Sequence, residues 1–312
     1  MDLLAGIKRG DRLALARAIS AVENRDDRRR ELIRYAYQQS RGTHIVGVTG
    51  PPGVGKSTLV DGLAARYREQ GQTVGIVAVD PTSPFTGGAL LGDRVRMQRH
   101  GLDEGVFIRS LATRGSLGGL SRATGEVIRL MDAFGFDVII VETVGAGQSE
   151  VDIMRFAGTV VLAMAPGLGD DVQSIKAGIM EIADIFCVNK ADRDGVDRTI
   201  AEIRMMLDLR PAQGWRPPII KAVASRDEGL EELRQGILEH QEHLKTSGAL
   251  MDRQLETFQA EVEEVLKDRL VNSIMKQAQD ELEEDFRQVR AGEADPIDVA
   301  ERLMAQHLNK GK

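Results

Sequence analysis

The fold is decided by residues 45–58, which read IVGVTGPPGVGKST. An apolar run leads there into Gly50-Pro51-Pro52-Gly53-Val54-Gly55-Lys56-Ser57, which matches the phosphate-binding pattern GxxxxGKS/T in full. Successive backbone N–H groups of such a loop can surround phosphates, and the N-terminus of a following helix favours their negative charge. Glycines allow this close approach because they carry no Cβ. We therefore expect a strand, a phosphate-binding loop and a helix in this order.

Two side chains of the loop have roles that follow from their chemistry. Lys56 can reach the β- and γ-phosphates of a nucleotide, and the Ser57 hydroxyl can ligate Mg²⁺. Thr58, the next residue, completes the predicted nucleotide-binding set of the loop. The loop therefore predicts a nucleoside triphosphate with its magnesium ion.

Outward from this loop, short β-branched runs alternate with longer helical patterns as far as about residue 243. The expected strands are Ile45–Thr49, Val74–Val79, Val138–Val141, Thr159–Ala163, Ile185–Val188 and Ile219–Ala222. The expected helices are Leu59–Gln70, Ala123–Phe134, Val196–Leu207 and Leu230–Leu244. This alternation indicates right-handed βαβ units, and strands apolar on both faces indicate a sheet covered by helices on both sides. The predicted fold class is α/β, a P-loop NTPase with a mostly parallel sheet, whose ligands lie at the carboxyl ends of the strands.

Carboxylates stand at the ends of two expected strands. Glu142 begins a Glu-x-x-Gly segment where P-loop GTPases usually carry Asp-x-x-Gly, so it can hold a magnesium water while the Gly145 N–H senses the γ-phosphate. Asp80 ends another strand, and Asp93 lies in a glycine-flanked segment beyond it. Mg²⁺ prefers an octahedral shell of oxygens and waters, so carboxylates are expected near it. The alternative for Asp80 and Asp93 is an ordinary turn residue or cap.

The identity of the base is indicated by Asn189-Lys190-Ala191-Asp192, which follows an expected strand. Guanine carries an N1–H and an exocyclic amine, and the Asp192 carboxylate can accept from both, whereas adenine lacks this paired donor edge. Asn189 can address the opposite edge, and the Lys190 stem can cover the ring. Near Ser225, after the last strand, backbone N–H groups can meet guanine O6. Buried paired contacts discriminate by roughly 10⁴, so the sequence predicts GTP and GDP.

Composition narrows the class of partner. A net charge of −7 and only 4% aromatic residues disfavour binding to nucleic acid or to an anionic membrane. No apolar run reaches the roughly 20 residues that span a bilayer, and the N-terminus lacks the pattern of a signal or transit peptide. Cys187, the single cysteine, is expected to be a small buried strand residue. We therefore expect a cytoplasmic protein that contacts neither nucleic acid nor membrane.

Longer segments make the chain resemble the MeaB/ArgK-type GTPases, the G-protein chaperones of adenosylcobalamin-dependent acyl-CoA mutases such as methylmalonyl-CoA mutase. The specific segments are Asp80-Pro81-Thr82-Ser83, Gly92-Asp93-Arg94-Val95-Arg96-Met97 and Glu142-Thr143-Val144-Gly145-Ala146-Gly147-Gln148-Ser149-Glu150. The resemblance covers nearly the whole chain. It implies GTP or GDP and Mg²⁺ as ligands, a B12-dependent mutase as partner, and a role in gating and protecting delivery of the cofactor.

The resemblance also implies roles for individual residues. The implied magnesium set is Ser57, Asp80, Asp93 and Glu142. Residues 80–97 and 142–155 would form two switches, and residues 167–176 a third. In the third, Asp170 and Lys176 are candidates for coupling the nucleotide state to the mutase, or else they belong to an ordinary helix start.

Gln148 has two possible roles. In some GTPases a glutamine just after the second switch glycine orients the attacking water, but here Ala146-Gly147 displaces it. It either keeps that role or contacts a switch or the partner. The candidate catalytic set is Lys56, Glu142, Gln148, Asp170 and Lys176. Because no arginine finger or well-placed glutamine is evident, we expect slow hydrolysis until a partner completes the site.

Three segments and two rival functions complete the prediction. Residues 1–42 are expected to form a helical extension, residues 43–246 the GTPase domain, and residues 247–312 a helical segment for homodimerisation. The last carries an apolar helical face made of Leu255, Phe258, Val262, Val265 and Leu266. The rivals are an ATP-dependent kinase linked to basic amino-acid transport, which the Asn189–Asp192 motif argues against, and a nickel-insertion GTPase, which one cysteine and scattered histidines argue against.

Overall fold

The structure, a computed structural model, describes residues 2–80, 98–112, 122–143, 152–167, 180–209, 214–279 and 281–308. The chain forms two compact units, residues 1–254 and residues 255–312. No helix within the described ranges is both long and apolar enough to cross a membrane. The division into three segments stays a prediction.

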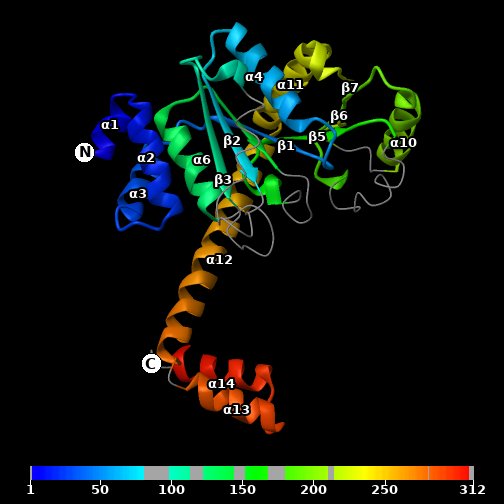
Figure 1. The fold of residues 1–312 in the computed structure, drawn as a ribbon. Helices are drawn as coiled ribbons and strands as arrows, with labels where there is room; N and C mark the ends of the chain where they lie inside the picture. Colours follow the sequence, from blue (N-terminus) through cyan, green and yellow to red (C-terminus); the bar gives the residue numbers. More distant parts are fainter. Residues whose placement is uncertain are drawn as a thin grey trace. The chain divides into compact units, whose positions relative to one another are not determined.

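Among the described residues, the first unit is built on a parallel sheet of seven strands (Figure 1). Its strands are β1 His44–Thr49, β2 Val74–Asp80, β3 Val106–Ala112, β4 Val138–Glu142, β5 Thr159–Met164, β6 Ile185–Val188 and β7 Ile219–Lys221. Their order across the sheet is β3-β2-β4-β1-β5-β6-β7, and every neighbouring pair is parallel. The predicted α/β class is confirmed, and the strand carrying the phosphate-binding loop lies at the centre of the sheet.

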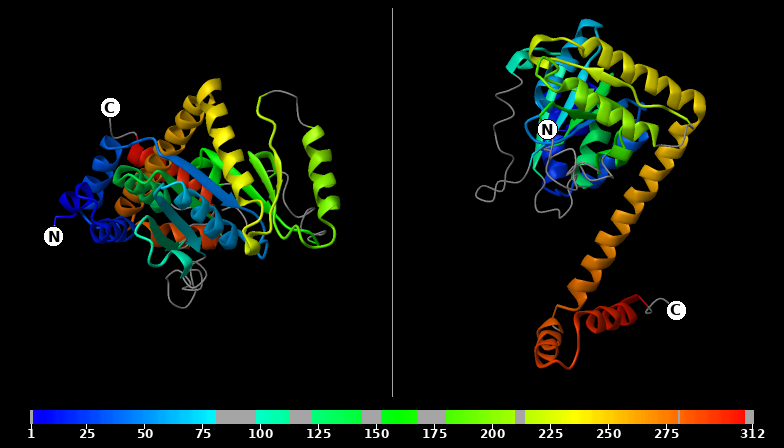
Figure 2. Two further views of the ribbon diagram at one scale, coloured as in Figure 1. Left: turned by 90° about the horizontal axis from the view of Figure 1, so that it is seen from above. Right: turned by 90° about the vertical axis from the view of Figure 1, so that its right-hand side faces the viewer.

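Helices cover both faces of this sheet (Figure 2). They are α1 Leu3–Lys8, α2 Arg12–Glu23, α3 Arg29–Gln38, α4 Lys56–Glu69, α6 Arg122–Phe134, α10 Val196–Asp208 and α11 Leu230–Ser247. The N-terminal helices and α6 share one core with Ile139 and Val141 of β4, while α4 and α11 share another with Val138 and Ile140. Alternate residues of one strand thus face opposite helical layers, as a sheet buried on both sides requires.

Sequence reasoning missed β3. Arg109 and Ser110 interrupt its apolar run, so it lacks the β-branched signal of the other strands. The strand lies at the edge of the sheet, where Arg109 pairs with Glu23 of α2 and also donates to Ser20. The N-terminal helices therefore provide the polar partner that this edge strand needs.

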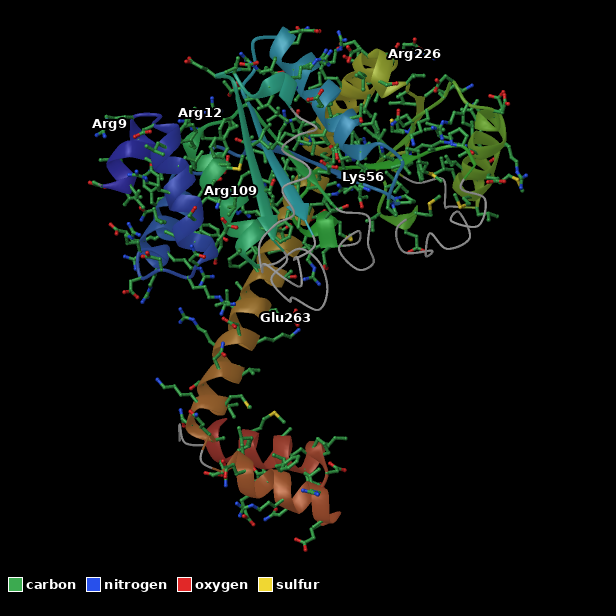
Figure 3. The ribbon with its side chains drawn as sticks, viewed as in Figure 1. Arg9, Arg12, Lys56, Arg109, Arg226 and Glu263 are labelled. Atoms are coloured by element: carbon green, nitrogen blue, oxygen red, sulfur yellow. The ribbon has the colours of Figure 1, made fainter. Side chains whose placement is uncertain are left out.

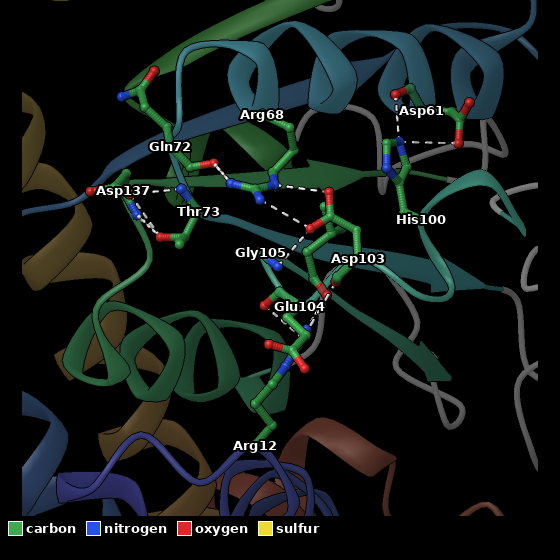
Figure 4. A network of polar contacts seen from close by, with 11 residues as sticks. Arg12, Asp61, Arg68, Gln72, Thr73, His100, Asp103, Glu104, Gly105 and Asp137 are labelled. Atoms are coloured by element: carbon green, nitrogen blue, oxygen red, sulfur yellow. Dashed lines mark hydrogen bonds and ion pairs between the residues drawn. The ribbon is translucent and has the colours of Figure 1, made fainter.

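Asp103 is the centre of a polar network between the short helix η1 (Gln98–His100) and β3 (Figure 4). Arg68 of α4 donates to both carboxylate oxygens of Asp103, at 2.9 and 3.0 Å. Arg12 of α2 donates to the Glu104 carbonyl at 2.8 Å. These contacts fix the entry to β3 against helices from both faces of the sheet.

A second polar network lies buried at the amino edge of the sheet, opposite the phosphate-binding loop. Thr159 Oγ1 lies 2.8 Å from both His44 Nε2 and His240 Nδ1, and His240 Nε2 lies 3.3 Å from Asp184 Oδ1. Arg253 donates to both oxygens of Asp184, at 3.0 and 2.7 Å. Since a nitrogen facing a carboxylate is best protonated, the bonds run from His44 through Thr159 and His240 to Asp184.

The second unit consists of helices. It contains residues from 255 onward of α12 (Ala249–Gln277), with α13 (Leu282–Ala291) and α14 (Pro296–Leu308). Arg302 of α14 pairs with Glu281 at 2.8 Å and with Asp285 of α13 at 2.5 Å, and Leu303 is buried beside them. Along α12 the apolar residues Leu255, Phe258, Val262, Leu266 and Leu270 are exposed. Four of these residues belong to the face that the sequence predicted, whereas Val265 of that face is partly buried.

Candidate functional site

The phosphate-binding loop joins β1 to α4 at the carboxyl edge of the sheet, where Lys56 lies (Figure 3). Gly50 and Gly55 both have positive φ, 139° and 92°. A Cβ on Gly50 would lie 2.1 Å from the Ala163 carbonyl oxygen of β5, and one on Gly55 would lie 2.6 Å from the Asn189 amide nitrogen. Glycine is thus required for the loop to lie against β5 and against the predicted base-binding motif.

Lys56 is almost completely buried and its ammonium bends back over the loop. Its Nζ donates to the carbonyl oxygens of Gly50 at 2.8 Å and Pro51 at 3.0 Å. Bonds between an ammonium and a phosphate are stronger than those to neutral carbonyls. The side chain is therefore held where it can transfer from loop carbonyls to the phosphates of a nucleotide.

Ser57 and Glu142 bring two of the four predicted magnesium residues together. Ser57 Oγ donates to Glu142 Oε1 at 2.6 Å, and both residues are buried. Below them, Thr143 Oγ1 donates to Thr49 Oγ1 at 2.9 Å and its N–H to the Val48 carbonyl at 3.1 Å, which fixes the end of β4 against β1. A hydroxyl and a carboxylate beside a phosphate loop are hard oxygen ligands, so the pair fits Mg²⁺.

Asn189 connects the predicted base-binding motif to its two neighbouring loops. Its Nδ2 donates to the Val54 carbonyl of the phosphate loop at 2.8 Å, and its Oδ1 accepts from the Ala224 N–H at 3.0 Å. Ala224 begins the short helix η3 (Ala224–Arg226), which contains Ser225. An amide nitrogen carries two hydrogens, so Asn189 keeps one donor for a base while it fixes both loops.

Lys190 and Asp192 belong to the same predicted base-binding motif as Asn189. Lys190 has a φ of 56°, and its Nζ donates to the Gly53 carbonyl at 2.6 Å, so its stem extends from the β6 loop toward the phosphate loop. Asp192 is partly exposed and accepts from Arg226 Nη2 at 3.2 Å. Sequence reasoning missed Arg226, whose only signal was its place directly after Ser225.

Several predicted residues lie outside the described part of the chain. They are Asp93, Gly145, Gln148, Asp170 and Lys176. Asp80 is the last residue of β2, next to β4, but its side chain is not among those described. The roles of these six residues, like those of the other predicted site residues, stay predictions. Cys187 is buried in β6 as expected, and burial raises the pKa of its thiol to about 12.

The family model of the methylmalonyl-CoA mutase-associated GTPase MeaB matches residues 15–279, which include the whole of this site. The chain belongs to the MeaB family. It is therefore a GTPase that binds guanine nucleotides, as the Asn189–Asp192 motif predicted. The match begins within α2 and ends just beyond α12.

Relatives of known name agree with this membership. A Pyrococcus abyssi protein assigned as a GTPase is 50% identical, over 99% of this chain and 97% of its own. The mouse mitochondrial protein named methylmalonic aciduria type A homolog is 38% identical, over 80% of this chain and 64% of its own. Escherichia coli GTPase ArgK is 36% identical, over 78% of this chain and 76% of its own.

A solved structure with the same fold carries a different name. The crystal structure of an LAO/AO transport system kinase superposes with a TM-score of 0.74 at 26% identity, covering 98% of both chains. Its name matches the kinase function that the sequence left as a rival. The MeaB-family match and the GTPase relatives place this chain among GTPases.

Proposed function

We propose that this GTPase is a chaperone that gates delivery of adenosylcobalamin to a B12-dependent acyl-CoA mutase of the methylmalonyl-CoA mutase type and protects that enzyme. The observation that carries the proposal is the match over residues 15–279 to a family named for its association with methylmalonyl-CoA mutase. The mouse relative, named for methylmalonic aciduria, supports it.

On the phosphate side of the proposed site, each described side chain has a distinct task. The loop N–H groups and the Lys56 ammonium bind the phosphates. Ser57 and Glu142, 2.6 Å apart, would hold Mg²⁺, which supplies positive charge to the phosphate oxygens. Asp80 and Asp93 are proposed to complete the surroundings of the ion.

On the base side, Asp192 is proposed to accept from guanine N1–H and the exocyclic amine. Asn189 offers its remaining N–H to the opposite edge, and Lys190 covers the ring. Support comes from the two bonds by which Asn189 connects the phosphate loop to η3, because they set the distance between the phosphate and base halves of the site. Ser225 is proposed to present its backbone N–H to guanine O6.

Coupling to the mutase is proposed to run through the switch segments. Gln148, Asp170 and Lys176 are the candidates for positioning water or for responding to the partner. Hydrolysis by the protein alone is expected to be slow, and the mutase is expected to accelerate it by ordering the switches.

The exposed stripe of α12 supports a homodimer. Leu255, Phe258, Val262, Leu266 and Leu270 recur at three- and four-residue intervals and are all exposed. A stripe at this spacing suits packing against a second helix of the same kind. We expect Phe258→Asp with Leu266→Asp to convert a dimer to a monomer in light scattering, whereas the exposed charge change Lys267→Glu should leave the dimer intact. If the unmodified protein is a monomer in light scattering, the proposed homodimer is wrong.

The proposal as a whole is tested by complex formation. Purified protein is mixed with methylmalonyl-CoA mutase in GDP or in a non-hydrolysable GTP analogue and separated by size. A complex whose amount differs between the two nucleotides is expected, since a switch must present different surfaces in its two states. The absence of a complex in both nucleotides, with this mutase and with related acyl-CoA mutases, would refute the partner assignment.

A further inference from the structure

Arg226 contacts the carboxylate that is proposed to recognise guanine. Its Nη2 lies 3.2 Å from Asp192 Oδ2, although the two residues are 34 positions apart in the chain. They come from different loops, since Asp192 follows β6 whereas Arg226 ends η3 after β7. The pair therefore spans the rim of the proposed base site.

The backbones of the loops after β6 and β7 are held by hydrogen bonds that do not involve the Arg226 or Asp192 side chains. The Ala191 N–H donates to the Ala222 carbonyl at 3.0 Å, and the Ala224 N–H donates to Asn189 Oδ1 at 3.0 Å. The Arg226 N–H donates to the Val223 carbonyl at 2.8 Å. Because the backbones on both sides are held, the Arg226 and Asp192 side chains start from fixed positions on their two loops.

We propose that Arg226 is a specificity-determining positioning residue that orients the Asp192 carboxylate for guanine. The inference rests on the proposed role of Asp192. A carboxylate has about four acceptor positions, so it can accept from Arg226 and from two guanine donors together. Guanine offers two donors side by side, and both bonds form only when the carboxylate lies in the plane of the base. By restricting its rotation, Arg226 favours the two-bond arrangement.

Inosine diphosphate can reveal the effect of Arg226, because its base offers Asp192 one donor where guanine offers two. Hypoxanthine has N1–H but no exocyclic amine, so inosine diphosphate makes one bond to Asp192 and tolerates a rotated carboxylate. Loss of the Arg226 side chain should therefore weaken the binding of GDP more than the binding of inosine diphosphate. The expected size is small, because an exposed ion pair changes an equilibrium by at most about fivefold.

A matched control is available on the same loop. Arg99 donates to both oxygens of Asp227, at 3.2 and 3.0 Å, and Asp227 directly follows Arg226. This pair also holds the loop through an exposed arginine, and it does not contact Asp192. Arg99→Ala should therefore change the affinity for GDP and inosine diphosphate by the same factor, or not at all.

Calorimetric titration of GDP, inosine diphosphate and xanthosine diphosphate into four variants tests the inference. Arg226→Ala is expected to lower the preference for GDP over inosine diphosphate by up to about fivefold. Arg226→Lys, which keeps the charge, should restore part of that preference, and Arg99→Ala should leave it unchanged. An unchanged preference in Arg226→Ala, or a gain in GDP affinity, would overturn the role of Arg226.

The fourth variant, Asp192→Asn, tests the proposed base site independently. Its amide can donate to the carbonyl that xanthine carries in place of the guanine amine, so preference should move from GDP toward xanthosine diphosphate. If it does not move, the assignment of Asp192 fails. If the preference of Asp192→Asn moves toward xanthosine diphosphate while Arg226→Ala leaves the preference for GDP over inosine diphosphate unchanged, only the inference about Arg226 fails.

Discussion

The two edges of the central sheet each carry a polar cluster, and the two clusters differ in how their bonds are used. At the amino edge, His44, Thr159, His240 and Asp184 satisfy one another in a buried chain that ends on Arg253. At the carboxyl edge, the Lys56 ammonium rests on loop carbonyls, beside Ser57 and Glu142. Thr159, His240 and Asp184 resemble a nucleophile–base–acid set in composition, yet all three are buried. Composition alone does not distinguish a site from a structural network.

The comparison predicts that the two edges respond in opposite ways to mutation, and Lys56→Ala should give the largest effect. Removing the ammonium deprives the transferred phosphoryl group of a positive charge, so GTP turnover should fall about a thousandfold. The free energy of unfolding should change by about 1 kcal/mol, because the ammonium donates to neutral carbonyls of the loop. Steady-state phosphate release and urea denaturation measure the two quantities. A large loss of stability without loss of turnover would place Lys56 with the structural cluster.

Asp184→Ala should show the reverse pattern. Its carboxylate accepts from Arg253 and from the Val160 N–H, so its removal leaves buried donors unsatisfied and should lower the free energy of unfolding by about 3 kcal/mol. GDP affinity of the folded variant should stay near that of the unmodified protein. Urea unfolding and nucleotide titration test this. A strong loss of GDP affinity at full folding would mean that the amino edge serves the site.

The amino edge should also be sensitive to pH. Burial lowers the pKa of His44 and of His240 from 6.5 to about 4. The unfolded chain therefore takes up protons first, and stability that is present above pH 6.5 is lost as the pH falls toward 4. At pH 5 the loss should be about 2 kcal/mol for each of the two histidines. Unfolding midpoints between pH 7 and pH 5 measure it, and His44→Gln should flatten the dependence. A midpoint independent of pH over this range would contradict the buried neutral histidines.

The smallest predicted effect concerns the Thr49–Thr143 pair. It lies at the carboxyl edge but is buried and bonded within itself, so it should behave like the amino-edge cluster. Thr143→Val should cost about 1 kcal/mol of unfolding free energy and leave GTP turnover within about twofold. A turnover loss much greater than the stability loss would show that this pair positions Glu142 for the reaction.

The sequence predicted the features that are encoded locally. The phosphate loop is contiguous, and β-branched runs such as Ile185–Val188 mark their strands without reference to the rest of the chain. β3 was not predicted because Arg109 interrupts its apolar pattern, and the partner of Arg109, Glu23 of α2, is distant in the sequence. Arg226 escaped because its partner lies on another loop. Contacts between residues distant in sequence depend on how loops converge at the sheet edge, and no short pattern records that.

We propose that the carboxyl edge of the sheet holds a guanine nucleotide whose turnover responds to a B12-dependent mutase. The most direct measurement is the rate of phosphate release from saturating GTP and from ATP, with and without methylmalonyl-CoA mutase. We predict slow hydrolysis of GTP alone, at least a tenfold acceleration by the mutase, and no comparable turnover of ATP. Equal turnover of ATP and GTP, or a GTP rate unaffected by any acyl-CoA mutase, would contradict the account.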